Sequence, residues 1–261
     1  EFEIGGDIIQ NKEFTWTSNL NMSHTTGKIL TLWGNNTYYN GNGFVAPGTP
    51  GDAARIEEGS TIGSFYIWKF AGFDDDGNFL LYNKDGEVIP AEKKTENDKQ
   101  FIGNYTPKLI LGWNNTFSYK NFDLGINMRS WIDFDVYNTI NMYYGIQGRG
   151  NTNVLKEAYG KFNHIKGEKQ ICDYYLEDGT FLKIDAITLG YTLNMKKYTN
   201  NLVDRIRVYA TVGNVCTITG YSGMNPEVNI TGWDQGTEKF WDTGSFYPMA
   251  RTYTLGMQFN F

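Results

Sequence analysis

Hydrophobic and polar residues alternate strictly along several segments of this chain. In residues 251–261 the apolar side chains are Tyr253, Leu255, Met257, Phe259 and Phe261, and the positions between them are small or uncharged polar. A period of two places the apolar side chains on one face of a β-strand. The other face suits a water-filled lumen better than a packed core, which is typical of a strand between lipid and water. A strand of a soluble β-sandwich is the alternative.

Six further segments show the same alternation. They predict strands at about 2–10, 12–24, 108–119, 122–129, 181–193 and 204–215. Short polar turns near 11, near 120 and at 195–203 join some of them as hairpins, whereas the long stretches 25–107, 135–180 and 216–250 join the others. Transmembrane barrels have short periplasmic turns and long outer loops. The division of the connections into short turns and long loops therefore predicts an all-β fold, an antiparallel transmembrane β-barrel with the long loops outside.

The number of predicted strands is odd, whereas single-chain bacterial barrels close with an even number. An open sheet in lipid would leave backbone groups unpaired at two edges, which costs several kcal/mol for each group. No signal peptide precedes the first strand pattern, which begins directly after Glu1. We therefore expect this chain to be the carboxyl-terminal part of a longer barrel, with further strands before it.

The composition narrows the class of protein. Its 18 Tyr, 17 Phe and 7 Trp suit the aromatic girdles of a barrel, although an all-β carbohydrate-binding protein is similarly rich in aromatic residues. No apolar run approaches the roughly 18–20 residues of a membrane helix, which excludes a helical membrane protein. With a net charge of -6 and no basic stretch interleaved with aromatics, we expect no nucleic-acid partner.

Signatures of catalysis and of metal binding are weak. The sequence has no Gly-x-Ser-x-Gly, His-Glu-x-x-His or phosphate-loop motif, so we expect no enzyme activity and no cofactor. Glu177 and Asp178 are adjacent, and adjacent strand residues point to opposite faces, so we interpret them as solvated loop charges rather than glycosidase carboxylates. Segment 74–78, Asp-Asp-Asp-Gly-Asn, lacks the terminal Glu of a helical calcium motif and predicts a hairpin turn instead. Cys172 and Cys216 fall in predicted loops, where a disulfide and two free thiols are both open.

Several segments resemble SusC/RagA-type TonB-dependent transporters. Residues 175–193 (YLEDGTFLKIDAITLGYTL) are similar to a barrel strand of that family, and 207–214 (RVYATVGN) followed by 217–228 (TITGYSGMNPEV) are similar to its penultimate strand and the loop after it. Residues 247–256 are similar to its last strand. The segments 57–65, 102–107 and 119–124 fit the same template in order. The stretch Asn214-Val-Cys-Thr departs from the usual Asn-Leu-Phe-Thr.

The resemblance implies a plug-filled barrel of about 22 strands, of which this chain supplies roughly the last third. It implies a place in the outer membrane of a Gram-negative bacterium, import of a glycan or peptide nutrient, and a SusD-like surface lipoprotein that covers the barrel as a lid. It also implies a TonB system that acts through an amino-terminal, plug-bearing portion of the same transporter. An all-β glycan-binding surface module and a passive porin are the alternatives.

Two groups of residues are candidates for function. The stretch 216–250 carries aromatic residues among Asp, Asn, Gly and Thr, a combination that suits sugar rings or peptides, although packing of the loop is the alternative. The final strand fits the pattern of an assembly signal that is recognised by β-augmentation, although Phe261 could be a girdle residue only. The candidates for contact with substrate or lid are Tyr221, Trp233, Phe240, Trp241 and Tyr247, and those for assembly are Thr254, Gly256, Phe259 and Phe261.

Overall fold

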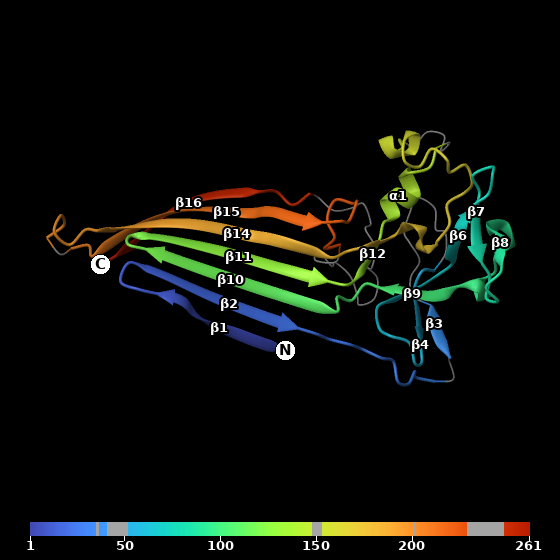
Figure 1. Cartoon of the computed structure of the whole chain (residues 1–261), viewed down its shortest axis with the longest axis horizontal. Helices are drawn as coiled ribbons and strands as arrows, with labels where there is room; N and C mark the ends of the chain where they lie inside the picture. Colours follow the sequence, from blue (N-terminus) through green and yellow to red (C-terminus); the bar gives the residue numbers. More distant parts are fainter. Residues whose placement is uncertain (35–36, 41–51, 148–152, 201, 229–247) are drawn as a thin grey trace.

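The computed structural model describes residues 1–34, 37–40, 52–147, 153–200, 202–228 and 248–261. Its main feature is a long antiparallel sheet of seven strands in the order β1-β2-β10-β11-β14-β15-β16 (Figure 1). The seven predicted strands are confirmed in number and order. Their bounds are β1 (Phe2–Gln10), β2 (Phe14–Ser23), β10 (Leu109–Tyr119), β11 (Phe122–Ile132), β14 (Phe181–Asn194), β15 (Arg205–Thr219) and β16 (Thr252–Asn260).

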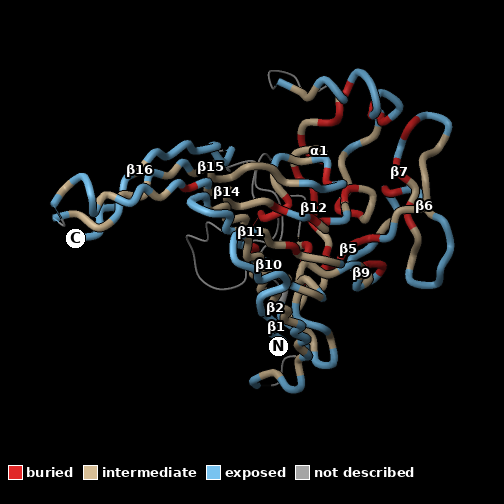
Figure 2. The backbone as a smooth tube through the Cα atoms, turned by 60° about the vertical axis from the view of Figure 1, so that its left-hand side comes forward, coloured by how far each residue is buried: buried red, intermediate tan, exposed pale blue. Residues whose placement is uncertain are grey.

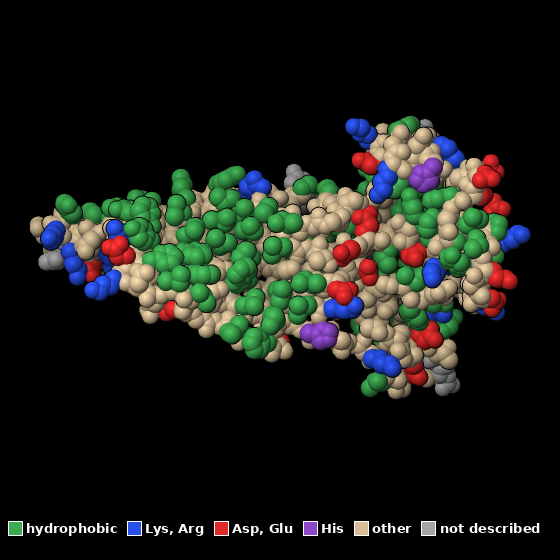
Figure 3. Space-filling model, in the orientation of Figure 1, with side chains coloured by type: hydrophobic (Ala, Val, Ile, Leu, Met, Phe, Trp, Pro, Cys, Tyr) green, Lys and Arg blue, Asp and Glu red, His purple; other side chains and the backbone are tan. Residues whose placement is uncertain are grey.

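The register of the sheet keeps apolar residues on one face. Leu124 of β11 lies opposite Phe117 of β10 and Leu189 of β14, so it has apolar neighbours on both sides. Figure 3 shows the result as an apolar band over the sheet, with charged side chains at both of its ends. On the other face Asn127 lies opposite Asn114. This separation of faces is what lipid on one side and water on the other require of a barrel wall.

Polar residues interrupt the apolar face, and two of them, Asn115 and Ser18, are each hydrogen bonded to a tryptophan. The Trp16 indole N–H donates to Asn115 Oδ1 at 3.0 Å, and the Trp113 indole N–H donates to Ser18 Oγ at 2.8 Å. Asn115 and Ser18 lie opposite each other in the register of β10 and β2. A polar group that faces lipid is costly unless it is hydrogen bonded, so the two indoles lower that cost.

Short and long connections lie at opposite ends of the sheet (Figure 1). The turn between β1 and β2 is closed by Asn11, whose Oδ1 accepts hydrogen bonds from the backbone N–H groups of Glu13 and Phe14. The turn between β10 and β11 uses Lys120 at a φ of 53°. Among the described residues, no helix is both long and apolar enough to cross a membrane.

The long connections fold into a packed region of their own at the other end of the sheet. Figure 2 shows that the buried residues gather there rather than in the sheet. Its core includes Phe65, Ile67, Leu81, Tyr137 and Ile171. The elements are β3 (Tyr38–Asn40), β4 (Arg55–Glu57), β5 (Ser64–Ile67), β6 (Lys69–Phe73), β7 (Phe79–Tyr82), β8 (Val88–Pro90), β9 (Gln100–Asn104), β12 (Asp135–Tyr137), α1 (Thr139–Tyr144) and β13 (Leu176–Asp178), with short 3-10 turns between them.

The hairpin turn predicted at 74–78 is confirmed. It joins β6 and β7, and Asp74 Oδ1 accepts hydrogen bonds from the backbone N–H groups of Asp76 at 3.0 Å and Asn78 at 2.8 Å. Hydrogen bonds from the Asn78 side chain and backbone lower the pKa of the Asp74 carboxyl, so the carboxylate form that makes this turn is favoured.

The sequence leaves a disulfide and two free thiols both open, and only the position of Cys216 differs from the prediction. Both are free thiols, and Cys216 lies within β15 rather than in a loop, because the strand continues past a bulge as far as Thr219. Cys172 does lie in a connection, but it is fully buried in the core of the connection region. Burial raises the pKa of the Cys172 thiol, which keeps it protonated and unreactive.

Candidate functional site

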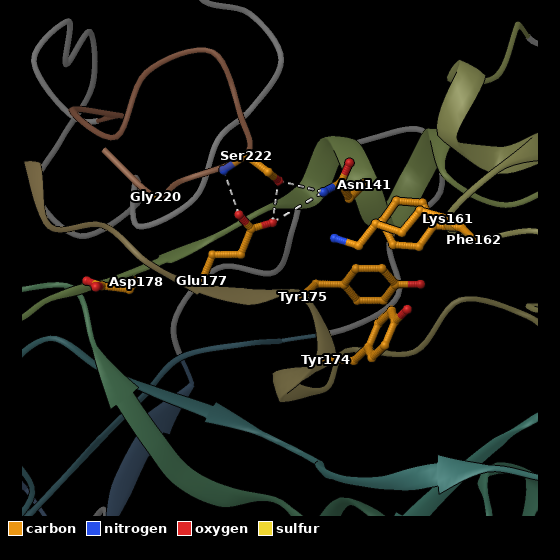
Figure 4. A pocket seen from close by; sticks show the side chains of 9 residues that line it. All are labelled: Asn141, Lys161, Phe162, Tyr174, Tyr175, Glu177, Asp178, Gly220 and Ser222. Carbon is orange, nitrogen blue, oxygen red and sulfur yellow. Dashed lines mark hydrogen bonds between the residues drawn. The ribbon is translucent and has the colours of Figure 1, made fainter. Parts of the chain in front are cut away.

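A groove crosses the connection region where four segments of the chain meet (Figure 4). Two cavities of 390 and 350 Å³ share Asn141, Lys161, Phe162 and Ser222 as lining residues, so they adjoin as the two halves of this groove. The first half is also lined by residues of the 3-10 turn Asp173–Tyr175 and of β13. The second half extends along α1 toward Leu155 and Met224.

One carboxylate holds three of these segments together. Glu177 Oε1 accepts hydrogen bonds from Asn138 Nδ2 at 2.9 Å, Asn141 Nδ2 at 3.2 Å and Ser222 Oγ at 2.7 Å, and Oε2 accepts one from the Ser222 backbone N–H at 2.8 Å. Asn138 also caps α1, because its Oδ1 accepts from the Asn141 backbone N–H. The interpretation of solvated loop charges is therefore wrong for Glu177, whereas Asp178 is exposed as expected.

An aromatic cluster forms one wall of the groove. The Tyr174 ring packs edge-on or tilted against Phe70 at 4.9 Å, Phe73 at 5.3 Å, Tyr175 at 5.0 Å and Phe162 at 6.3 Å between ring centroids. Rings packed at these angles hold one another in place, so the wall is preorganised. Burial raises the pKa of the Tyr174 hydroxyl, and the neighbouring Cys172 adds a smaller contribution in the same direction. The hydroxyl therefore remains a proton donor at neutral pH.

Lys161 lies where the two halves of the groove meet. Its side chain is exposed, and it makes no salt bridge within the part of the chain that the structure describes. Its ammonium nitrogen lies 5.1 Å from the centroid of the Phe162 ring, a cation–π distance. Carboxylates lie in both halves, Glu177 and Asp178 in the first and Glu157 in the second. The groove thus has a cation in the middle and an acid in each half.

A buried ionic cluster lies on the polar face of the sheet. Glu227 accepts from Lys183 Nζ at 2.7 Å and pairs with Arg129 Nη2, also at 2.7 Å, while Arg129 Nε lies 3.4 Å from Asp185. The side chains of Lys183 and Glu227 are 3% and 0% exposed. Charges as buried as these are stable only when they are paired. The cluster therefore fixes the start of the connection after β15 against the wall.

The five candidates for contact with substrate or lid, in the connection 216–250, fall into two groups. Tyr221 is 5% exposed and packs in a small cluster with Phe134, Val136, Phe181 and Val228. The other four candidates for contact with substrate or lid lie outside the described residues; they are Trp233, Phe240, Trp241 and Tyr247.

The candidates for assembly lie on β16 and just after it, with Thr254 and Gly256 on the polar face and Phe259 on the apolar face. Phe259 is 49% exposed and Phe261 is 86% exposed. Gly256 lies opposite Tyr209, and a Cβ at this position would collide with the Tyr209 ring. A glycine is thus required here for close packing of the ring on the strand.

Sequence reasoning missed the groove itself. Its residues come from irregular segments and from elements of three to six residues, where no period can be read. The clearest available signal was Asn138, a good helix cap in front of a short helical segment. Among the described residues, no group of three or more His, Cys, Asp and Glu side chains is placed to hold a metal ion.

An antiparallel sheet with one apolar and one polar face, and with its long connections at one end, is the architecture of a transmembrane β-barrel wall. Comparison with known proteins gives a more particular likeness. The chain is 27% identical over its whole length to TonB-dependent receptor P3 of Formosa agariphila and 27% identical to TonB-dependent receptor SusC of Bacteroides thetaiotaomicron. The resemblance to SusC/RagA-type proteins inferred from the sequence motifs is therefore confirmed.

Solved structures show the same fold. The structure of the RagAB peptide transporter matches 98% of this chain with a TM-score of 0.77 at 22% identity, and that of the RagAB peptide importer in the open-open state matches 99% with a TM-score of 0.72. The chain spans 28% of the length of each of these two structures, and 28% and 26% of the two curated relatives. No family model matches the chain.

Proposed function

We propose that this chain forms part of the barrel wall of a TonB-dependent transporter that imports a glycan or peptide nutrient across the outer membrane of a Gram-negative bacterium. The observation that carries the proposal is the two-faced sheet, which has a predominantly apolar face and a polar face that holds paired charges. On the polar face the Arg207 guanidinium pairs with Asp123 through two nitrogens. Similarity to TonB-dependent receptors over the whole chain supports the proposal.

The partners follow from the same sheet. In the described strand order β1 and β16 are terminal, so each has one edge without a neighbouring strand. In lipid such edges must be paired, and we assign that role to the remaining strands of the same transporter, which would also carry the plug and the segment that contacts TonB. A SusD-like lipoprotein would cover the end where the long connections gather. The RagAB structures are of a peptide importer, which supports a peptide as one class of cargo.

The test is uptake by cells that express the full-length protein with and without TonB. We expect the protein in the outer-membrane fraction, together with a surface lipoprotein, and uptake of a labelled oligopeptide or oligosaccharide mixture that stops when TonB is deleted. Uptake that persists without TonB would instead indicate a passive porin. A protein that remains in aqueous buffer without detergent and binds glycans would indicate a surface module.

A further inference from the structure

We propose that the end of the sheet with the short turns binds anionic phospholipid headgroups in the inner leaflet of the outer membrane. We call this surface the basic end and define it by its exposed cations, which are Lys12, Lys120, Lys196, Lys197 and Arg205. The inference rests on the proposed place of the sheet in a barrel wall, because the short turns of such barrels lie on the periplasmic side. It goes beyond import by giving this part of the wall a ligand of its own.

A row of aromatic side chains marks where the apolar face ends at the short turns. In the register Tyr119 of β10 lies opposite Phe122 of β11, which in turn lies opposite Tyr191 of β14. The rings of Phe122 and Tyr191 are 4.7 Å apart between centroids. Aromatic residues in such a row lie at the boundary between hydrocarbon and headgroups. Lys120 Nζ is 5.2 Å from the centroid of the Tyr119 ring, so the basic end adjoins this boundary.

The basic end, where Figure 3 shows Lys and Arg side chains beside the apolar band, carries more positive charge than its own acids neutralise. Lys120 Nζ lies 3.6 Å from Glu13 Oε2, and Lys196 Nζ lies 3.3 Å from Asp204 Oδ1. The remaining cations are exposed and make no salt bridge with any residue that the structure describes; they are Lys12, Lys197 and Arg205. The chain as a whole carries a net charge of -6, so this local excess runs against its composition. Exposed cations at a membrane surface attract anionic lipids.

The connection between β14 and β15 favours a lipid surface over a soluble anion as the ligand. Its Tyr198 and Leu202 side chains are 80% and 73% exposed, and Tyr198 directly follows Lys197. The backbone between them is held in place, because Thr199 Oγ1 accepts a hydrogen bond from the Val203 backbone N–H at 3.0 Å. A soluble anion would need the cations alone. Exposed aromatic and aliphatic side chains next to lysines are instead the composition of segments that lie in the headgroup layer.

Lipid binding to the detergent-solubilised full-length transporter tests the inference. Anionic dioleoyl phosphatidylglycerol and zwitterionic dioleoyl phosphatidylethanolamine are titrated separately, and the bound lipids are counted by native mass spectrometry. One cation near a lipid surface contributes up to about fivefold in affinity. The triple variant Lys12→Gln/Lys197→Gln/Arg205→Gln should therefore lose roughly tenfold or more of its affinity for phosphatidylglycerol and none for phosphatidylethanolamine. Tyr198→Ser should lower both affinities, because an aromatic ring does not distinguish the two headgroups.

The matched control removes three exposed cations of the connection region, which also make no salt bridge with described residues. It is the triple variant Lys93→Gln/Lys156→Gln/Lys166→Gln. An 11-residue strand such as β10 separates the two ends by roughly 35 Å, which is several Debye lengths at physiological salt. The control variant should therefore bind phosphatidylglycerol as tightly as the unmodified protein does.

Four results would overturn the inference. They are equal affinity of the unmodified protein for the two lipids, an unchanged phosphatidylglycerol affinity in the basic-end variant, an equal loss in the control variant, and an unchanged affinity for both lipids in Tyr198→Ser. If the basic-end variant keeps its lipid affinity but loses binding to peptidoglycan sacculi, the basic end contacts the cell wall instead. If TonB-dependent uptake occurs while the lipid results fail, this inference fails alone. If the full-length protein is absent from the outer-membrane fraction, the proposed function fails.

Discussion

The buried cluster of Glu227, Lys183 and Arg129 allows a prediction that ranks three variants. Glu227→Gln removes the only anion that contacts Lys183 among the residues that the structure describes, and it leaves two cations in a site where the Lys183 side chain is 3% exposed. Breaking a buried pair in this way costs about 3–5 kcal/mol. Lys183→Met is milder, because Glu227 keeps its contact with Arg129 at 2.7 Å. Loss of one charged hydrogen bond costs about 1.5–3 kcal/mol.

The double variant Glu227→Gln/Lys183→Met decides whether pairing is the cause. It removes both charges of the pair and leaves Arg129 with Asp185, 3.4 Å away, so its stability should lie closer to that of Lys183→Met than to that of Glu227→Gln. The assay is the urea midpoint of the heat-modifiable folded band of the full-length protein in detergent. Glu92→Gln, an exposed site with the same change of charge, is the control and should not move the midpoint. If Glu227→Gln costs no more than Lys183→Met, the reasoning from buried charge is refuted.

Three further predictions concern the sheet. Leu124→Arg, on the apolar face, should cost roughly 2–4 kcal/mol near the bilayer midplane, whereas Asn127→Arg on the same strand should be tolerated. Equal folded fractions of these two variants on heating would contradict a lipid-facing apolar side. Trp16→Phe should cost about 1–3 kcal/mol by leaving Asn115 Oδ1 without its donor, and adding Asn115→Leu to this variant should restore the urea midpoint. A midpoint that the second substitution does not restore would show that the hydrogen bond is unimportant. Phe261→Ser should preserve stability in detergent but reduce the amount in the outer membrane, and an unchanged amount would leave only the girdle role.

The sheet could be predicted from the sequence because its environment imposes a period. Lipid on one side and water on the other force alternation along every strand, and the alternation at Leu124, Ile126 and Met128 is visible without any knowledge of their neighbours. Even the extent of β15 was underestimated, since the bulge after Gly213 breaks the period before the strand ends at Thr219.

The connection region could not be predicted in the same way because its order comes from contacts between distant residues. Glu177 and Ser222 are 45 positions apart, and the bridge between Trp68 and Cys172 joins segments still further apart. The strands β12 and β13 have three residues each and pair Val136 with Glu177. Nothing in such short segments distinguishes a hydrogen-bonded carboxylate from a solvated one. The role of Glu177 therefore becomes visible only when its partners are in place.

The groove and the ionic cluster both depend on the short segment that contains Ser222 and Glu227. Ser222 is bound in the groove by Glu177, and Glu227, in the same short segment, is bound in the ionic cluster. Loss of Glu227 therefore frees the segment that carries a wall of the groove, so Glu227→Gln should disturb the groove as well as lower the stability.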